Sequence, residues 1–179
     1  SAIKKINFEP KLISEKKELK KYSNLVLPGV GTFKSAMKYL KDNDLSESLK
    51  NFYEEKNKIL AICLGMQILL DTGFEFGRQK GLGIIQGEVK RIPENKIHLG
   101  WNLIKFKKSK NKNFFAYFVH SYYTEISDKD LILTETKINN FKFTSSFKKD
   151  NLLGCQFHLE KSGQAGLDLI KNFFINDRA

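Results

Sequence analysis

At 179 residues the chain is long enough for one domain with a hydrophobic core, and its apolar runs are too short to span a bilayer. The net charge of +11 comes mainly from scattered lysines, with arginine only at positions 78, 91 and 178, which favours a solvated basic surface over a nucleic-acid interface. Two cysteines make a poor disulfide framework and no stretch has the pattern of a secretory signal, which favours a reducing cytoplasm.

The beginning of the chain has an unusual pattern. Residues 2–8 resemble the end of a helix that leads to a strand at Lys11–Ser14, and no strand precedes them. Doubly wound sheets usually begin with a strand. We therefore predict a single domain over residues 1–179 that lacks the first strand at its N-terminus.

Strands and helices alternate in the following segment. A strand is predicted at residues 25–27, and the next helix has a face made of Ala36, Met37, Leu40, Leu49 and Phe52. A strand at Lys58–Ile62 and a helix from Leu64 to about Leu70 come next. This alternation predicts βαβ units and a parallel sheet.

From residue 81 onward the pattern is rich in strands. The candidates are residues 87–92, 103–106, 114–123, 131–135, 141–147 and 152–158. The chain closes with a helix that starts at Ser162 and has a core face of Leu167, Ile170, Phe173 and Phe174. The predicted fold class is α/β: a mostly parallel central sheet flanked by helices, with an antiparallel, strand-rich appendage.

The segment of residues 59–67 carries the sharpest chemical signal. An apolar strand runs directly into a helix, Cys63 stands at the junction, and Gly65 follows two residues later. This is the pattern of a nucleophile elbow, in which a tight turn projects the nucleophile above the sheet. A helix N-terminus favours a thiolate, and the N–H of Leu64 is placed to bind a developing oxyanion. The alternative is that Cys63 is a small buried apolar residue.

His158 and Glu160 provide a second signal. Residues two apart on an extended strand face the same way, so this pair can lie on one side near a strand end. Glu160 would then orient the imidazole, and His158 would take a proton from Cys63 and later return it to a leaving group. The alternative is a histidine satisfied at a strand end. Cys155 shares the parity of Phe157 and is interpreted as a packing residue.

A loop at residues 28–31 gives a third, weaker signal. Its two glycines allow backbone N–H groups to turn toward an anion or a carbonyl oxygen. No Gly-Lys-Ser/Thr follows, so it is not a phosphate loop, and an ordinary strand-to-helix turn is the more common meaning.

The order of these three segments resembles that of the class I (triad) glutamine amidotransferases. Three further segments are similar to the glutaminase subunit of imidazole glycerol phosphate synthase, the HisH family: residues 81–87 (GLGIIQG), 98–102 (HLGWN) and 117–122 (YFVHSY). The similarity extends from about Leu25 to Phe173. Joint occurrence of these motifs makes the resemblance specific.

The resemblance implies chemical roles by position. The catalytic triad would be Cys63, His158 and Glu160. Oxyanion N–H groups would come from Leu64, Val30 and Gly31, after a flip of the Pro28–Gly31 loop. The residues that hold the amino acid end of glutamine would be Gln67, Glu75, Ser121 and Tyr122. No cofactor and no metal are implied.

The resemblance also implies a partner. A cyclase subunit with a (β/α)8 barrel would form a heterodimer with this chain, receive its ammonia through a dry path, and make imidazole glycerol phosphate in histidine biosynthesis. The docking face would contain Trp101, Tyr117 and Lys161. Ammonia released into water near neutral pH would be protonated and lost as a nucleophile, which explains the need for a path that excludes water.

Two departures from the family pattern leave alternatives open. Leu159 replaces the proline of Phe-His-Pro-Glu, and Ile97 replaces a proline before the Gly-Trp-Asn motif. One alternative is a HisH-like amidotransferase that supplies ammonia for bacterial surface-sugar amidation. The other is a binding module on the same fold without catalysis, which the intact triad positions disfavour.

Overall fold

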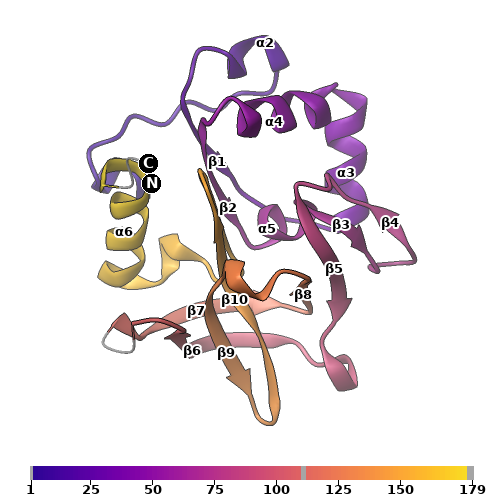
Figure 1. Ribbon diagram of the computed structural model, residues 1–179, viewed down its shortest axis with the longest axis vertical. Coiled ribbons are helices and arrows are strands. Elements are labelled where there is room, and N and C mark those ends of the chain that lie inside the picture. The colour runs from indigo at the N-terminus through magenta and orange to yellow at the C-terminus, as the bar shows by residue number, and fades with distance from the viewer. Residues whose placement is uncertain (1, 110–111, 177–179) are drawn as a thin grey trace.

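The computed structural model describes residues 2–109 and 112–176, which form one curled mixed sheet with helices on both sides (Figure 1). The helices are α1 (Ala2–Lys5), α2 (Lys16–Leu19), α3 (Phe33–Asp42), α4 (Leu45–Glu54), α5 (Leu64–Ile68) and α6 (Gly163–Lys171). The strands are β1 (Asn24–Leu27), β2 (Lys58–Ile62), β3 (Leu70–Gly73), β4 (Gln79–Lys80), β5 (Ile85–Arg91), β6 (His98–Phe106), β7 (Phe114–His120), β8 (Tyr122–Ile126), β9 (Ile132–Ile138), β10 (Phe141–Lys149) and β11 (Leu152–Cys155). None of these helices is long and apolar enough to cross a membrane.

Strand β2 lies at the centre of the parallel part. It pairs in parallel with β1 on one side and with β11 on the other, so that Ala61 lies between Leu27 and Gly154. Beyond β11 the order continues through β10, β8, β5, β3 and β4, and β3 pairs in parallel with β5. The α/β class with an antiparallel part is therefore confirmed.

The antiparallel part is built from long ladders. Strand β10 pairs antiparallel with β11, β8 and β9. Strands β6 and β7 form an antiparallel ladder from His98–His120 to Ile104–Phe114, and the far end of β6 joins β9. This part carries β7 to the edge of the sheet where β2 and β11 end, since Tyr117 bridges to His158.

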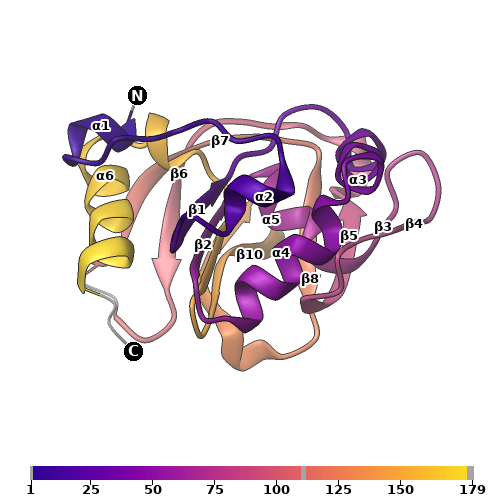
Figure 2. The same cartoon turned by 90° about the horizontal axis from the view of Figure 1, so that it is seen from above.

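Two hydrophobic cores lie on opposite faces of the parallel strands. Ile59 and Ala61 belong to the core with α3 and α4, whereas Leu60 and Ile62 belong to the core with α6. Figure 2 shows α1 and α6 on one side of β1 and β2, with α2, α3 and α4 on the other. A strand covered on both faces must be apolar throughout, which explains the unbroken run that predicted β2 with its correct bounds.

The predicted closing helix is confirmed in its core face. Ile170 and Phe173 are buried, and Leu167 and Phe174 pack against them. The α-helix ends at Lys171, and residues 172–176 continue as a wider turn of π type.

Several predicted boundaries are wrong for identifiable reasons. Residues 11–14 form no strand, and no described strand pairs with them. The helix predicted across residues 36–52 is two helices, separated where Asp44 adopts a left-handed conformation with φ 54°. The strand predicted at residues 114–123 is divided at Ser121, because β7 pairs with β6 and β8 pairs with β5.

Two glycines determine how closely β1, β2 and α5 pack. A Cβ added at Gly65 would lie 2.1 Å from the carbonyl oxygen of Leu27, and one at Gly29 would lie 2.2 Å from the nitrogen of Gly65. Neither position leaves room for a side chain. The loop after β1 therefore lies directly against the first turn of α5.

This close packing predicts that Gly65→Ala destabilises the protein, although the same replacement within a helix is usually stabilising. Within a helix, replacing Gly by Ala usually stabilises by about 1 kcal/mol, but here we expect a loss of about 1–3 kcal/mol from overpacking. Urea unfolding measures the change. Lys34→Ala on the exposed side of α3 is the control, expected within about 0.5 kcal/mol of wild type. A stabilised Gly65→Ala protein would contradict the close packing.

Candidate active site

Three adjacent parallel strands end at the same edge of the sheet, and each is followed by one of the predicted motifs. Strand β1 leads to the Pro28–Gly31 loop, β2 leads to Cys63, and β11 leads to His158. Ligands of open α/β sheets bind outside the carboxyl ends of the strands. The topology therefore brings together three motifs that are far apart in the sequence.

Cys63 occupies a tight turn between β2 and α5. Its backbone has φ 54° and ψ −111°, outside the usual regions for a residue with a Cβ. Its N–H donates to the carbonyl of Cys155 at 2.7 Å, which fixes the turn to the neighbouring strand. Such backbone strain is concentrated at functional sites, and the elbow predicted from the sequence is present here.

The sulfur of Cys63 is buried among polar groups of two other elements. Gln156 donates its Nε2–H toward Sγ at 3.6 Å, and the carbonyl of Val119 lies 3.9 Å from Sγ. Gln156 was not predicted from the sequence. It lies two residues before His158, so the same parity argument that paired His158 with Glu160 could have placed it on this side.

His158 contacts Glu160, although not in the way predicted. Strand β11 ends at Cys155, because α5 begins after Cys63 and β2 offers no further partner. His158 instead precedes a single 3₁₀ turn at Leu159–Lys161, and this turn brings Glu160 Oε1 to 2.7 Å from His158 Nδ1. The N–H of His158 donates to Tyr117 at 2.9 Å and holds the turn against β7.

The second ring nitrogen of His158 is not used by Glu160. Nε2 is buried and has no well-formed hydrogen bond with any described residue. The Cys63 side chain is nevertheless the largest cause, ahead of Glu160, that raises the pKa of His158 to about 9. Burial alone would raise the pKa of Glu160, but the hydrogen bond and charge of His158 lower it overall. The protonated imidazole is therefore the favoured form at neutral pH, with Glu160 ionised.

The predicted oxyanion groups lie at the same edge. The ideal Cβ of Gly29 would fall 2.4 Å from Leu64 Cβ, so the loop lies over the residue that follows the nucleophile. Gly31 has φ 94°, which suits glycine, and Val30 is 89% exposed at the loop tip. The role of these N–H groups stays a prediction.

The predicted substrate residues lie in two places. The buried side chain of Gln67 donates to the carbonyl of Tyr122 at 3.0 Å, and Ser121 lies at the break between β7 and β8. Glu75 instead accepts a hydrogen bond from the N–H of Phe33 at 2.6 Å, at the start of α3. Contact of these side chains with glutamine stays a prediction.

The predicted docking residues form one contiguous cluster. The rings of Trp101 and Tyr117 meet edge to face with centroids 6.1 Å apart, and Lys161 Nζ lies 5.5 Å from the centre of the Tyr117 ring. Trp101 is 57% exposed, and the outward side chains of Leu99, Phe115 and Val119 on the same two strands are exposed as well.

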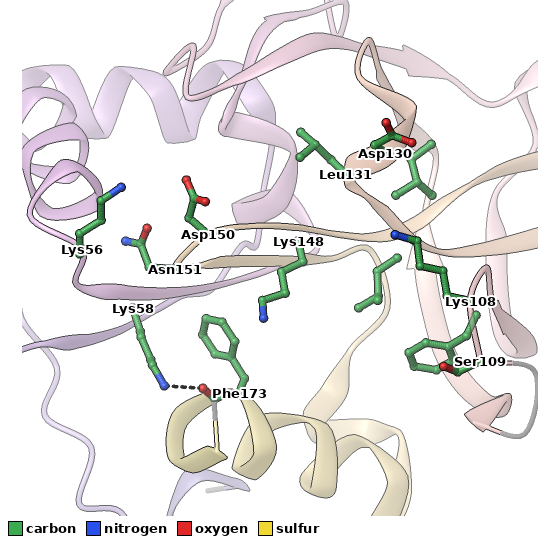
Figure 3. A pocket seen from close by; sticks show the side chains of 13 residues that line it. Lys56, Lys58, Lys108, Ser109, Asp130, Leu131, Lys148, Asp150, Asn151 and Phe173 are labelled. Atoms are coloured by element: carbon green, nitrogen blue, oxygen red, sulfur yellow. Dashed lines mark hydrogen bonds between the residues drawn. The ribbon is translucent and has the colours of Figure 1, made fainter. Parts of the chain in front are cut away.

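A pocket of about 780 Å³ lies at the opposite edge of the sheet (Figure 3). Lys58 at the start of β2 lines it, together with Lys56, Lys108, Asp130 and Asp150. Lys58 Nζ donates to the carbonyl of Phe173 at 2.8 Å, so this charge already stabilises the end of the closing helix. The pocket lies at the start of β2, whereas Cys63 follows the end of that strand, so the pocket is not part of the Cys63 site.

Comparison with known proteins gives consistent matches over the chain. The family model described as glutamine amidotransferase class-I matches residues 2–177. Imidazole glycerol phosphate synthase subunit HisH of Caldanaerobacter subterraneus subsp. tengcongensis is 40% identical, over 96% of this chain and 88% of that protein. Subunit HisH 2 of Methanococcus maripaludis is 44% identical, over 96% of this chain and 89% of that protein.

Solved structures agree in fold. PurLQS from Thermotoga maritima superposes with a TM-score of 0.79 and 14% identity, over 99% of this chain and 90% of that one. A crystal structure of a glutamine amidotransferase gives a TM-score of 0.76 and 16% identity, over 96% of this chain and 88% of that one. At these identities the likeness shows the fold alone.

The contact between Cys63 and His158 predicts how the imidazole titrates. His158 is expected to have a pKa near 9 in the wild type and a lower pKa in Cys63→Ala, because the largest cause of the shift is removed. Cys155→Ala is the control and should leave this pKa unchanged. Proton NMR of the ring resonances measures each value. A His158 pKa in Cys63→Ala equal to that of wild type would contradict the contact.

The same shift predicts a dependence of stability on pH. The folded pKa lies above the unfolded value of 6.5, so the stabilisation is fully present below pH 6.5 and is lost as the pH rises through about 9. We expect the stability difference between wild type and His158→Asn to shrink by roughly 1–3 kcal/mol across this window. Urea unfolding at several pH values measures it, and a constant difference would contradict the raised pKa.

Proposed function

Because the chain belongs to the class-I glutamine amidotransferase family, we propose that Cys63, His158 and Glu160 form its catalytic triad and hydrolyse glutamine to glutamate and ammonia. The observation that carries this proposal is the meeting of an elbow cysteine and a carboxylate-held imidazole at the carboxyl ends of β2 and β11. In this arrangement Cys63 is the nucleophile, His158 transfers protons to and from the reacting groups, and Glu160 orients the imidazole of His158.

The first half of the reaction forms a thioester. The Cys63 thiolate attacks the side-chain carbonyl carbon of glutamine, and the electron pair of the C=O bond moves to oxygen. Protonated His158 then donates its Nε2 proton to the amide nitrogen, the C–N bond breaks, and ammonia leaves. The raised pKa of His158 favours the protonated form that this step needs.

The second half regenerates the enzyme. Neutral His158 takes a proton from water, and the resulting hydroxide attacks the thioester carbonyl. The C–S bond breaks to give the Cys63 thiolate and the side-chain carboxylic acid, which loses its proton to water to give glutamate. Glu160 holds the imidazole at Nδ1 throughout, so Nε2 stays directed to the reacting groups. Each half of the reaction forms an oxyanion, and its negative charge would be stabilised by the N–H groups of Leu64 and of the Val30–Gly31 peptide.

We place glutamine between the nucleophile and the groups around Tyr122. Gln67, Ser121 and Tyr122 surround the β7–β8 break, and Glu75 supplies a carboxylate for the ammonium group of the substrate. Closure of the Pro28–Gly31 loop would complete this arrangement, since Val30 is at the exposed tip of that loop.

The chain is proposed to be the glutaminase subunit of an imidazole glycerol phosphate synthase in histidine biosynthesis. Support comes from HisH relatives that are 36–44% identical over most of the chain. The partner would be the cyclase subunit, a (β/α)8 barrel, in a heterodimer in the cytoplasm. The carbon–nitrogen chemistry that consumes ammonia would occur wholly in that partner.

The apolar face of β6 and β7 supports a docked partner. Leu99, Trp101, Phe115 and Val119 expose apolar side chains on one side of a two-stranded ladder, and exposed patches of this kind mark interaction sites. Tyr117 and Lys161 connect this face to His158 through the backbone bridge of Tyr117. A partner on this face would therefore lie beside the ammonia that is released.

Cysteine variants test the nucleophile. Cys63→Ala should abolish glutamate release in the presence of the co-purified partner and its ligand, because only the attacking thiol is removed. Cys155→Ala should retain near-normal turnover and lose about 1 kcal/mol of stability, since its fully buried thiol is a packing group. Retained turnover in Cys63→Ala, or a folded but inactive Cys155→Ala, would overturn the assignment.

Aromatic variants test the docking face. Trp101→Ala should weaken association with the cyclase subunit by about tenfold or more, because central aromatic residues dominate interface energies. Phe76→Ala is the matched control, since Phe76 is 74% exposed on the β3–β4 turn away from this face. Calorimetric titration gives both affinities. Equal affinities for the two variants would remove Trp101 from the interface, and capture of a glycan-modifying partner would instead support surface-sugar amidation.

A further inference from the structure

A chain of hydrogen bonds begins on strand β6 and reaches the backbone between β7 and β8. Asn102 Nδ2 lies 3.2 Å from His98 Nε2, and His98 Nδ1 lies 3.0 Å from His120 Nε2. His120 Nδ1 lies 2.7 Å from the carbonyl oxygen of Tyr122. Both imidazoles are buried, and the predicted triad uses neither of them.

The chain continues from Tyr122 to the nucleophile. The same carbonyl accepts a second hydrogen bond from Gln67 Nε2 at 3.0 Å. Gln67 Nε2 also donates to Gln156 Oε1 at 2.9 Å, and Gln156 Nε2 donates to Cys63 Sγ at 3.6 Å. The side chain that contacts the sulfur is therefore oriented by groups that lead back to the two histidines.

The protonation of His120 follows from its carbonyl partner. A carbonyl oxygen only accepts, so His120 Nδ1 must carry a proton. If the ring is neutral, His120 Nε2 is then an acceptor. His98 Nδ1 must supply the proton between the two rings, which leaves His98 Nε2 as an acceptor for Asn102.

The other end of the chain gives the same assignment independently. Asn102 Oδ1 accepts from the N–H of Leu103 at 2.7 Å, and Asn102 Nδ2 donates to the carbonyl of Lys137 at 3.1 Å. These two contacts fix the amide so that its NH₂ group faces His98. His98 Nε2 must accept, and His98 Nδ1 therefore carries the ring proton. A second proton on His120 would then oppose this donor across 3.0 Å.

The surroundings favour the neutral rings. Burial lowers the pKa of His98 to about 4 and that of His120 to about 3. The His98 ring stacks on Phe118 with centroids 4.4 Å apart, and Phe143 packs 5.2 Å from the His120 ring. Apolar packing on the faces leaves only the ring edges for hydrogen bonding.

We infer that His98 and His120 are positioning residues, which as neutral Nδ1–H rings direct an amide N–H toward the Cys63 sulfur. This inference rests on the proposed glutaminase function. The direction matters, because a Gln156 side chain turned by half a rotation would present its oxygen to the thiolate. The hydrogen bond from Gln67 prevents that rotation, and the Tyr122 carbonyl held by His120 fixes Gln67.

The tautomers are testable by nitrogen NMR without any activity. The sequence has three histidines, so a His158→Asn protein leaves only the resonances of His98 and His120. At pH 7 both rings should be neutral, with protonated Nδ1 and unprotonated Nε2. A cationic ring, or a neutral ring protonated at Nε2, would overturn the inference.

Kinetics test the effect on the nucleophile. His120→Phe keeps an aromatic ring but cannot donate to Tyr122, and we expect kcat for glutamine hydrolysis with the partner to fall about tenfold. His120→Asn keeps a donor near the position of Nδ1 and should recover part of this loss. Phe143→Leu is the control, because Phe143 packs against both imidazoles but makes none of these hydrogen bonds.

The outcomes separate this inference from the proposed function. If wild type releases glutamate and His120→Phe retains at least as much activity as Phe143→Leu at equal stability, the inference is wrong. If wild type releases no glutamate, the proposed function fails. The inference can then still be tested by the rate at which iodoacetamide alkylates the Cys63 sulfur. Slower alkylation in His120→Phe than in Phe143→Leu supports positioning, and equal rates overturn it. If His120→Phe does not fold, the nitrogen NMR spectrum of His158→Asn decides whether the inference holds, through the tautomers of His98 and His120.

Discussion

The turn at Cys63 is the constraint on which the rest of the site depends. The backbone conformation of Cys63, with φ 54° and ψ −111°, is unfavourable by about 1–3 kcal/mol for a residue that has a Cβ. Such a conformation persists only where the surrounding structure holds it. Here the N–H of Cys63 is bonded to Cys155 on one side, and Gly65 packs under the carbonyl of Leu27 on the other. Cys155 belongs to β11 and Leu27 to β1, and both strands pair in parallel with β2, so the sheet itself holds the turn.

Polar neighbours at His158 and burial at His120 shift the pKa values of these two histidines in opposite directions. His158 lies between a thiol and a carboxylate, and these raise its pKa to about 9. Burial lowers the pKa of His120 to about 3, although its hydrogen bond to the Tyr122 carbonyl acts in the opposite direction. The same side chain is therefore a cation suited to proton transfer at one position, and a fixed neutral hydrogen-bonding group at the other.

Strand β6 connects the docking face with the polar interior through the alternation of its side chains. Leu99 and Trp101 point outward, whereas His98 and Asn102 point toward the hydrogen-bond chain. Strand β7 repeats the arrangement, since Val119 is exposed while its carbonyl lies beside the Cys63 sulfur and His120 is buried next to it. The surface proposed for the partner and the groups around the nucleophile thus share two strands.

The sequence by itself determined whatever depends on local pattern. The continuous apolar run of β2 predicted its bounds, and the cysteine between that run and a helix predicted the elbow, because both signals lie within a few adjacent residues. The order of motifs also indicated the family. Contact between His158 and Glu160 was expected for an incorrect reason, since the residues meet through a 3₁₀ turn and not along a strand.

Only the tertiary structure decided how distant segments meet. The contacts of Gln156 with Cys63, and of His98 with His120, join residues 93 and 22 positions apart. Such contacts depend on which strands are neighbours and in which register, and residue periodicity within one strand contains no information about either. The break at Asp44 has a similar origin, because tertiary packing overrode the local helical preference there.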